Sequence, residues 1–238
     1  MRAVQARAHG LMMPRLLTTD EGWHSVRPMR RAVLHLQQVD PVLNKVIKQV
    51  GLCKILYAEP DFETLVRSIV FQQLSGKAAR AIFARFKAAL GNGSRMTSRE
   101  VLALTLEQMQ GLGLSRQKAK YIYDLAEKTE AGLIDFSRLA SGSDDEVIQY
   151  LTTVKGIGVW TAQMFLLFAL RRPDILATGD LGIRSAIRRL YRLRKLPSPA
   201  KVRQMAAKWH PHCSVACWYL WRSAGIVNLG RDAPPPSP

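Results

Sequence analysis

Residues Lys155-Gly156-Ile157-Gly158-Val159-Trp160-Thr161-Ala162 form the stretch that decides the fold. One helical pattern ends at Lys155 and another begins at Val159, so the two glycines between them make a turn too tight for side chains. Their backbone N–H groups can face outward beside the start of a helix, which is a ready site for a phosphate. Thr178-Gly179-Asp180 follows downstream and puts an aspartate at the next helix start. The turn alone is weak evidence, but the turn and the aspartate together are specific.

Apolar residues recur every three to four positions along most of the chain, and the repeats begin near capping residues or prolines. These patterns predict helices at about residues 28–39, 41–50, 62–70, 78–90, 115–130, 144–153, 159–170, 181–193, 199–208 and 214–224. Thr105 and Ser143 each begin a capping-box pattern. No segment alternates with the period of two that a strand requires. The sequence therefore predicts an all-α protein with two helical lobes and a cleft between them.

One helical domain accounts for most of the chain, since no linker interrupts residues 20–230. Residues 1–19 form a basic tail and residues 231–238 are rich in proline, so both ends are predicted to be disordered. The hairpin with the two glycines occupies about residues 144–170 of the domain. Its apolar second arm is too short to span a membrane and is predicted to be a buried helix.

Basic residues outnumber acidic residues, giving a formal net charge of +17 and a pI of about 10.4. The mean hydropathy of -0.06 and the 47% of hydrophobic residues are typical of a globular protein with a real core. No acidic residue occurs between Leu181 and Arg231, a stretch that is rich in lysine and arginine. A merely soluble basic surface is one explanation, but the uneven distribution favours a nucleic-acid partner.

Three cysteines occur in the chain, at Cys53, Cys213 and Cys217. An odd and widely spaced set argues against a disulfide framework and indicates a reducing compartment. Three thiolates are also too few for the four-cysteine set that holds most iron–sulfur clusters. The segment His210-Pro211-His212-Cys213 contains metal-ligating side chains, but its spacing fits no standard zinc pattern. The sequence therefore does not support a zinc site there.

The glycine turn, Asp180 and the segment Phe71-Gln72-Gln73-Leu74-Ser75 together resemble the helix-hairpin-helix DNA glycosylase superfamily. The resemblance covers roughly residues 30–228 and is nearest to the 3-methyladenine DNA glycosylase II type. It implies a compact base-excision repair enzyme, without an amino-terminal β-domain, that acts on double-stranded DNA. The implied substrates are alkylated purines such as 3-methyladenine and 7-methylguanine, which are flipped out of the duplex.

Asp180 is the catalytic aspartate that this resemblance implies, although an aspartate at this position also suits an ordinary N-cap. A carboxylate stabilises the positive charge that develops on the sugar when an N-glycosidic bond breaks, and it can deprotonate the attacking water. Trp160 stands where bifunctional relatives carry a nucleophilic lysine, so no amine is available there for a Schiff base. We therefore expect a monofunctional hydrolase.

Flat aromatic side chains are the candidates for the pocket of the flipped base, because they stack on a purine and attract a cationic one. The resemblance implies such a role for Trp160 and Trp221, and Trp218, Met164 and Phe71 are further candidates. Core packing is the alternative for each of them. Gln73, with Leu74, lies in the loop that the resemblance identifies as the wedge that fills the gap left by the base. A plain turn between helices is the alternative there.

Phosphates of the DNA backbone are expected to bind at the hairpin and on the basic helix after Asp180. The candidate contacts are Lys155, Gly156, Ile157, Gly158, Thr161, Arg184 and Arg188. The resemblance also raises a structural Na⁺ or K⁺ on backbone carbonyls near Thr153, Lys155 and Gly158, which the sequence alone does not establish. No organic cofactor is expected.

Two other functions fit the same residues. The first is a glycosylase for oxidised or deaminated bases, and the tryptophan at the lysine position disfavours the bifunctional kinds. The second is a non-catalytic helix-hairpin-helix DNA-binding protein, which would have no use for Asp180 beside tryptophans. We expect a monomer that binds DNA and not a membrane, in the cytoplasm with the nucleoid or in the nucleus.

One segment departs from the family pattern. Relatives tend to have an Arg-Ser pair after a Trp-x-Pro turn, whereas this chain reads Trp209-His210-Pro211-His212-Cys213-Ser214. The run Trp218-Tyr219-Leu220-Trp221-Arg222 that follows fits the pattern well. The resemblance therefore does not predict the local interactions of residues 209–214 near the candidate pocket.

Overall fold

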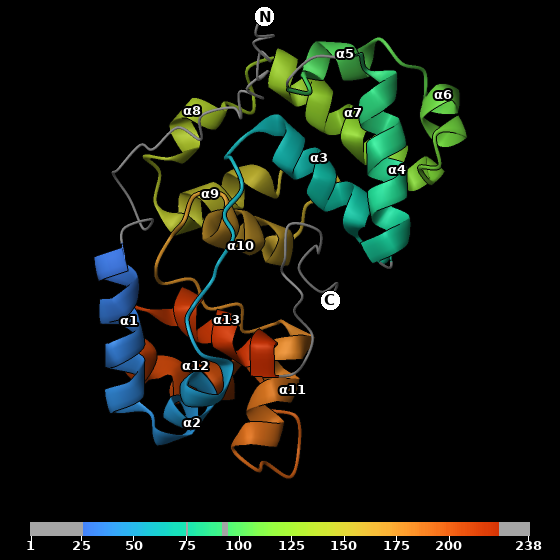
Figure 1. Cartoon of the computed structure of the whole chain (residues 1–238). Helices are drawn as coiled ribbons and strands as arrows, with labels where there is room; N and C mark the ends of the chain where they lie inside the picture. Colours follow the sequence, from blue (N-terminus) through green and yellow to red (C-terminus); the bar gives the residue numbers. More distant parts are fainter. Residues whose placement is uncertain (1–25, 75, 92–94, 224–238) are drawn as a thin grey trace, which may run out of the picture.

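The computed structural model describes residues 26–74, 76–91 and 95–223, and every regular element within these ranges is a helix (Figure 1). The all-α prediction is therefore confirmed. The two predicted tails, residues 1–19 and 231–238, lie outside the described residues. Among the described helices, none is both long enough and apolar enough to cross a membrane.

The first and last helices of the chain form one group, drawn in blue, orange and red in Figure 1. The group contains α1 (Val26–Val39), α2 (Pro41–Val50), α11 (Leu181–Leu190), α12 (Pro199–Ala206) and α13 (Cys213–Ser223), with a 3-10 turn η1 at Ala207–Trp209. Asp40 caps α2, and Pro41 follows in the first turn, where its missing N–H costs nothing. α13 is buried from Cys213 to Trp221 because α2 and α11 both pack against it.

The middle of the chain forms a second group, drawn in cyan and green in Figure 1. This group contains α3 (Phe62–Phe71), α4 (Gly76–Ala89), α5 (Ser98–Leu102), α6 (Leu106–Gly111) and α7 (Arg116–Glu130). α7 packs against α3, α5 and α6, so it is the central helix of the group. The sequence did not predict α5, because its five residues hold too few apolar repeats to reveal a helix.

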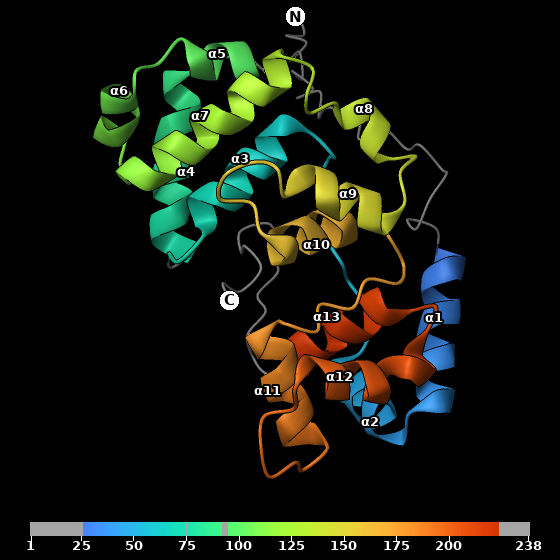
Figure 2. The same cartoon turned by 180° about the vertical axis from the view of Figure 1, so that it is seen from behind.

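Three helices follow the second group in the chain and lead back to α11: α8 (Phe136–Leu139), α9 (Asp144–Leu151) and α10 (Val159–Phe168). Figure 2 shows α9 and α10 side by side, joined by the glycine turn as predicted. α10 is buried beyond its first turn because it packs against α9 and α3. The four-residue α8 was not predicted, for the same reason as α5.

An irregular segment, residues 51–61, leads from α2 to α3 and passes the end of α10, where the Ala58 N–H donates to the Phe168 carbonyl at 2.9 Å. α11 ends at Leu190 and not at the predicted Leu193, since Arg192 adopts a left-handed φ of 55°. The fold brings the start of α11 close to α10 and α13, which positions the candidate site. The cleft between the two groups stays a prediction.

Candidate active site

Asp180 is the N-cap of α11 and is almost completely buried, with 1% of its surface exposed. Its Oδ1 accepts the backbone N–H of Ile183 at 2.7 Å, as expected of a capping aspartate. The same oxygen accepts the indole N–H of Trp221 at 3.0 Å, and Oδ2 accepts the indole N–H of Trp160 at 2.8 Å. Donors from α10, α11 and α13 therefore hold both carboxylate oxygens in place.

The two tryptophans come from helices that are distant in the sequence. Trp160 lies in the first turn of α10, directly after the glycine turn, and is half-buried. Trp221 lies in α13, is completely buried and stacks on Phe168 with ring centroids 6.0 Å apart. The sequence analysis gave both a pocket role but did not predict that both would donate to Asp180. Of the two, only Trp160 keeps exposed surface on which a base can stack.

The contacts of the Asp180 carboxylate within the described part of the chain are all with uncharged donors. Among the described residues, no lysine, arginine or histidine forms an ion pair with it. Its donors are N–H dipoles, which fix the oxygens but carry no net charge. In a buried and weakly polarisable environment, such a carboxylate attracts an approaching cation strongly. The arrangement suits a reaction in which positive charge develops beside Asp180.

The other candidates for the base pocket all lie in the core. Trp218 is 3% exposed and packs edge-on against Tyr219, with ring centroids 5.0 Å apart. Met164 is 3% exposed, and Phe71 is 2% exposed and packs edge-on against Phe83. Core packing, the alternative explanation, therefore accounts for these three side chains in this structure, and a role in a pocket stays a prediction for each.

The two glycines of the hairpin are needed for different reasons. Gly156 has a φ of 82°, and a Cβ there would lie 2.1 Å from the Tyr121 ring, so only glycine fits. A Cβ on Gly158 would meet nothing within 4 Å. Gly158 is the N-cap of α10 and provides no side-chain cap, so the first N–H groups of α10 are left for an outside acceptor such as a phosphate. Lys155, with 74% of its side chain exposed, adds positive charge beside them.

Asp124 anchors the hairpin from α7, and the sequence analysis missed it. Its Oδ2 accepts the backbone N–H of Lys155 at 2.9 Å and the Lys128 ammonium at 2.5 Å, while Lys155 Nζ lies 3.4 Å from Oδ1. Desolvation opposes ionisation of Asp124, but the hydrogen bonds from Lys128 and Lys155 outweigh it and lower its pKa. The sequence did contain a signal for this role, because Asp124 is an acidic residue between Ile122 and Leu125, which are both buried.

Two of the three carbonyls predicted to hold a monovalent cation, those of Thr153 and Gly158, already accept hydrogen bonds. The Thr153 carbonyl accepts from the Lys128 ammonium at 2.8 Å, and the Gly158 carbonyl accepts from the Ala162 N–H at 3.0 Å. A carbonyl oxygen has two lone pairs, so these bonds leave room for an ion. Lys128 nevertheless supplies positive charge at this edge of the hairpin, and a bound Na⁺ or K⁺ stays a prediction.

The loop between α3 and α4 is connected to the hairpin through Gln72. Its Nε2 donates to the Gly156 carbonyl at 2.8 Å, and the Lys118 ammonium donates to the Gln72 carbonyl at 2.5 Å. The adjacent Gln73 is exposed and has a left-handed φ of 55°, and Leu74 is 36% exposed. Both side chains therefore lie at the surface beside the hairpin, as a wedge requires, and the wedge role stays a prediction.

The remaining phosphate candidates differ in their accessibility. Arg188 is exposed on α11. Arg184 is half-buried, and its Nε donates to the Pro197 carbonyl at 2.8 Å, so it also fixes the loop that follows α11. Thr161 is 6% exposed, so its hydroxyl does not lie at the surface, and only its backbone N–H in the first turn of α10 is left for the phosphate contact, which stays a prediction.

Comparison with known proteins agrees with this geometry. Residues 66–212 match the model of the HhH-GPD superfamily of base excision DNA repair proteins. DNA-3-methyladenine glycosylase 1 of Schizosaccharomyces pombe is 34% identical over 223 residues, which cover 92% of this chain and 98% of the relative. The chain belongs to the HhH-GPD superfamily, and the predicted family is confirmed.

Two solved structures are similar over most of the chain. The 3-methyladenine DNA glycosylase of Schizosaccharomyces pombe in complex with abasic DNA is 36% identical, with a TM-score of 0.74, and the match covers 83% of this chain and 98% of that one. A DNA-3-methyladenine glycosidase from Bacillus halodurans is also 36% identical, with a TM-score of 0.72, and the match covers 82% and 89%. The helix-hairpin-helix glycosylase fold is therefore confirmed.

Proposed function

We propose that this protein is a monofunctional DNA glycosylase that hydrolyses the N-glycosidic bond of alkylated purines in double-stranded DNA. The observation that carries the proposal is the carboxylate of Asp180, which is buried, held by two indole N–H groups and without an ion pair among the described residues. The names of the relatives support 3-methyladenine as a substrate. We add 7-methylguanine because it also carries a positive charge on the purine.

Asp180 acts on the sugar. The bond between C1′ and the base breaks, and its electron pair leaves with the base, which departs neutral because the alkylated purine was cationic. The sugar becomes an oxocarbenium ion, which the Asp180 carboxylate stabilises. Water then attacks C1′ and gives its proton to Asp180 or to the solvent. The products are the free base and an abasic site, and the reaction needs no organic cofactor.

Trp160 provides the contact with the base. Asp180 is 1% exposed, so a flipped nucleotide reaches it only if a neighbouring group moves, and Trp160 is the half-buried one of its two indole donors. Its ring stacks on the flipped purine, and a cationic purine gains cation–π attraction as well. No amine stands at this position, so the enzyme has no carrier for a lyase step there.

DNA is held through its phosphates. The uncapped first turn of α10 binds one phosphate, with Lys155 beside it and Arg188 along α11, while Gln73 and Leu74 fill the gap in the duplex. The net charge of +17 strengthens this binding and makes it dependent on salt. We propose that a single chain suffices and that it works in a reducing compartment with DNA.

The test is base release from methylated duplex DNA. Wild-type protein is expected to release free 3-methyladenine and 7-methylguanine and to leave abasic sites uncut. Borohydride is expected to trap no covalent complex with the DNA. Asp180→Asn is expected to bind the same DNA and to release almost no base.

Three outcomes would contradict the proposal. If the protein released only oxidised or deaminated bases, the proposed substrate class would be wrong. DNA binding without any base release by the wild type would leave a non-catalytic DNA-binding protein. Strand cleavage with a borohydride-trapped complex would make the enzyme bifunctional.

A further inference from the structure

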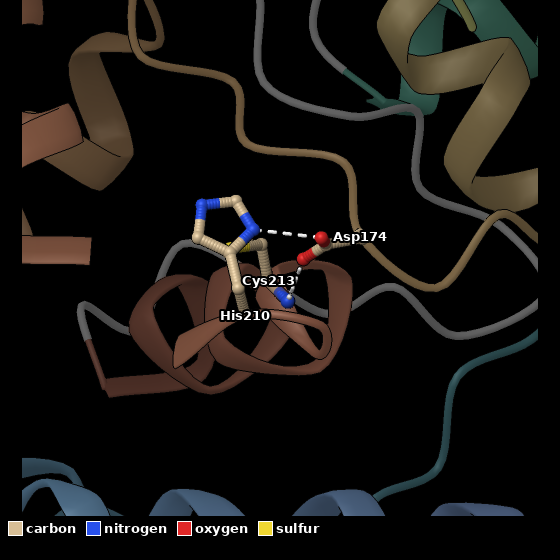
Figure 3. A group of neighbouring side chains, drawn as sticks. All are labelled: Asp174, His210 and Cys213. Atoms are coloured by element: carbon tan, nitrogen blue, oxygen red, sulfur yellow. Dashed lines mark hydrogen bonds and ion pairs between the residues drawn. The ribbon is translucent and has the colours of Figure 1, made fainter. Parts of the chain in front are cut away.

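Asp174, His210 and Cys213 form a cluster outside the candidate active site (Figure 3). Asp174 lies in the loop between α10 and α11, His210 directly follows η1, and Cys213 is the first residue of α13. Figure 3 shows the Asp174 carboxylate between the His210 imidazole and the start of α13. One ligand atom of each residue lies within 4.8 Å of the other two. The base-excision function makes no use of this cluster.

The two distances from His210 can be compared with those of a tetrahedral metal site, while the Asp174 and Cys213 ligand atoms lie within 4.8 Å of each other and would have to draw closer around a metal. A zinc ion bonds nitrogen at about 2.0–2.1 Å and sulfur at about 2.3 Å, so the two ligand atoms lie roughly 3.6 Å apart. The His210 Nδ1 and Cys213 Sγ are 3.6 Å apart. His210 Nδ1 and Asp174 Oδ2 are 2.7 Å apart and would have to separate by roughly 0.7 Å. The His210 side chain is 51% exposed, so its ring has room to make this movement.

The kinds of ligand atom select the metal. An imidazole nitrogen, a thiolate and a carboxylate oxygen form a set that zinc accepts, whereas calcium and magnesium prefer oxygen alone. Asp174 can bind a metal through Oδ2 without losing its other contact, because the Cys213 N–H donates to Oδ1 at 3.1 Å. That contact holds the carboxylate in position beside the thiol.

A simpler explanation is that Asp174 only caps α13 and pairs with His210. This explanation covers the carboxylate and the imidazole, and Asp174 also accepts a hydrogen bond from the Cys213 thiol. The two explanations differ in that only a metal site gives a bond between the Cys213 thiolate and a metal.

We propose that Asp174, His210 and Cys213 form a zinc site, with Oδ2, Nδ1 and Sγ as ligands and a water molecule as the fourth. Zinc takes the place of the thiol proton of Cys213, which is released to the buffer, and the neutral imidazole keeps its proton on Nε2. The exposed side of His210 is the path by which zinc and water enter.

The site connects two segments that meet again at Asp180. Asp174 precedes Asp180 by six residues, and Cys213 precedes Trp221, a donor to Asp180, by eight. Zinc therefore fastens the loop that leads to Asp180 onto the helix that supplies Trp221. Zinc is expected to stabilise the folded protein, because it binds the folded state and the unfolded chain has no preformed site for it.

The test is cobalt and zinc binding to the full chain, stripped with a chelator and kept reduced. Co²⁺ is expected to bind one ion per chain with a thiolate-to-cobalt charge-transfer band and the visible bands of a tetrahedral site. Zinc is expected to abolish these bands and to raise the melting temperature. Cys213→Ser and His210→Gln are each expected to weaken binding by about 100-fold.

Matched controls separate this site from adventitious binding. Cys53→Ser removes another thiol and is expected to leave the cobalt bands unchanged, as is His35→Gln, which removes another imidazole. The zinc proposal is wrong if the wild type gives no charge-transfer band, or if the band survives in Cys213→Ser. It is also wrong if Cys53→Ser removes the band. Should Cys213→Ser fail to fold, the exposed His210→Gln decides by itself.

Discussion

Two buried aspartates, Asp40 and Asp180, each cap a helix, and their surroundings differ in charge. Asp40 is 0% exposed and Asp180 is 1% exposed. Both accept backbone N–H groups through Oδ1, and both accept indole N–H groups. Asp40 Oδ2 also accepts the Tyr191 hydroxyl at 2.5 Å and lies 3.2 Å from the Lys208 ammonium. Asp180 has no cation beside it among the described residues.

This difference distinguishes Asp40, whose carboxylate is structural, from Asp180, whose carboxylate we propose to be catalytic. Desolvation alone would raise the pKa of Asp40, but hydrogen bonds from Tyr191, Trp209, the Leu43 N–H and Lys208 outweigh it and lower that pKa. Burial, followed by the hydrogen bond to Asp40, raises the pKa of Tyr191, which therefore stays a donor. The charge of Asp40 is satisfied inside the protein. Among the described residues no cation pairs with Asp180, which supports the proposal that it stabilises positive charge on the substrate.

The largest expected effect is on the rate of base release, which should differ between variants of the two aspartates. Asp180→Asn is expected to slow base release by roughly 10²–10³-fold, because an amide cannot stabilise the cationic sugar as a carboxylate does. Asp40→Asn is expected to keep the wild-type rate per folded molecule. Single-turnover base release on methylated DNA measures both, and equal losses in the two variants would remove the distinction.

A second contrast of the same kind separates the two glycines of the hairpin. Gly156→Ala is expected to cost about 3 kcal/mol of unfolding free energy, since its φ is left-handed and its Cβ would strike Tyr121. Gly158→Ala is expected to cost about 0.5 kcal/mol, because its Cβ meets nothing within the protein. Urea unfolding measures both changes.

The DNA affinity of the same two variants completes this test. Gly158→Ala is expected to weaken binding by about tenfold, or about 1.4 kcal/mol, because its methyl group occupies the space of the proposed phosphate. Wild-type affinity in Gly158→Ala, measured in the same salt, would mean that no phosphate approaches this glycine.

A smaller effect is expected on stability at the two aspartates. Asp40→Asn is expected to cost about 2 kcal/mol of unfolding free energy, since its new amide would face the donors of Tyr191, Trp209 and Lys208. Asp180→Asn is expected to cost about 1 kcal/mol, because the amide oxygen can keep the two bonds of Oδ1 and only the half-buried Trp160 loses its acceptor. Urea unfolding at neutral pH gives both numbers, and the reverse order would refute this account.

The smallest effect is a pH dependence. Because the pKa of Asp40 is lower in the folded protein than its ordinary value of 3.8, the unfolded chain takes up a proton first as the pH falls. The stability that Asp40 contributes is therefore complete above pH 3.8 and is lost as the pH falls through the folded pKa. The difference in unfolding free energy between wild type and Asp40→Asn should shrink below pH 3.8. A difference that grows on acidification would contradict the lowered pKa.

Local patterns predicted most of the helices, because a cap and an apolar repeat act within one turn of the chain. Thr105, Ser143 and Asp180 all cap helices, as their positions predict. The same reasoning missed α5 and α8, which are too short to show a repeat. It also extended α11 by three residues, since nothing in the sequence marked the left-handed turn at Arg192.

The candidate site was predicted only in part. The glycine turn and Asp180 are adjacent to helix starts and were visible as motifs. The interactions that hold them cross long distances in the chain: Asp124 binds Lys155, and Gln72 binds the Gly156 carbonyl. Nothing in the spacing of single residues reports such contacts, because they depend on how helices pack.

The sequence by itself therefore determined most of the helices, the glycine hairpin and the aspartate that follows it. Each of these depends on the chemistry of residues within a few positions of one another. Only the tertiary structure decided that Asp180 has two indole donors and no ion pair with any described residue, whereas Asp40 has one indole donor and a lysine. It also decided that Asp174 meets His210 and Cys213. The charge around a buried group is set by side chains from several helices, and only packing brings those together.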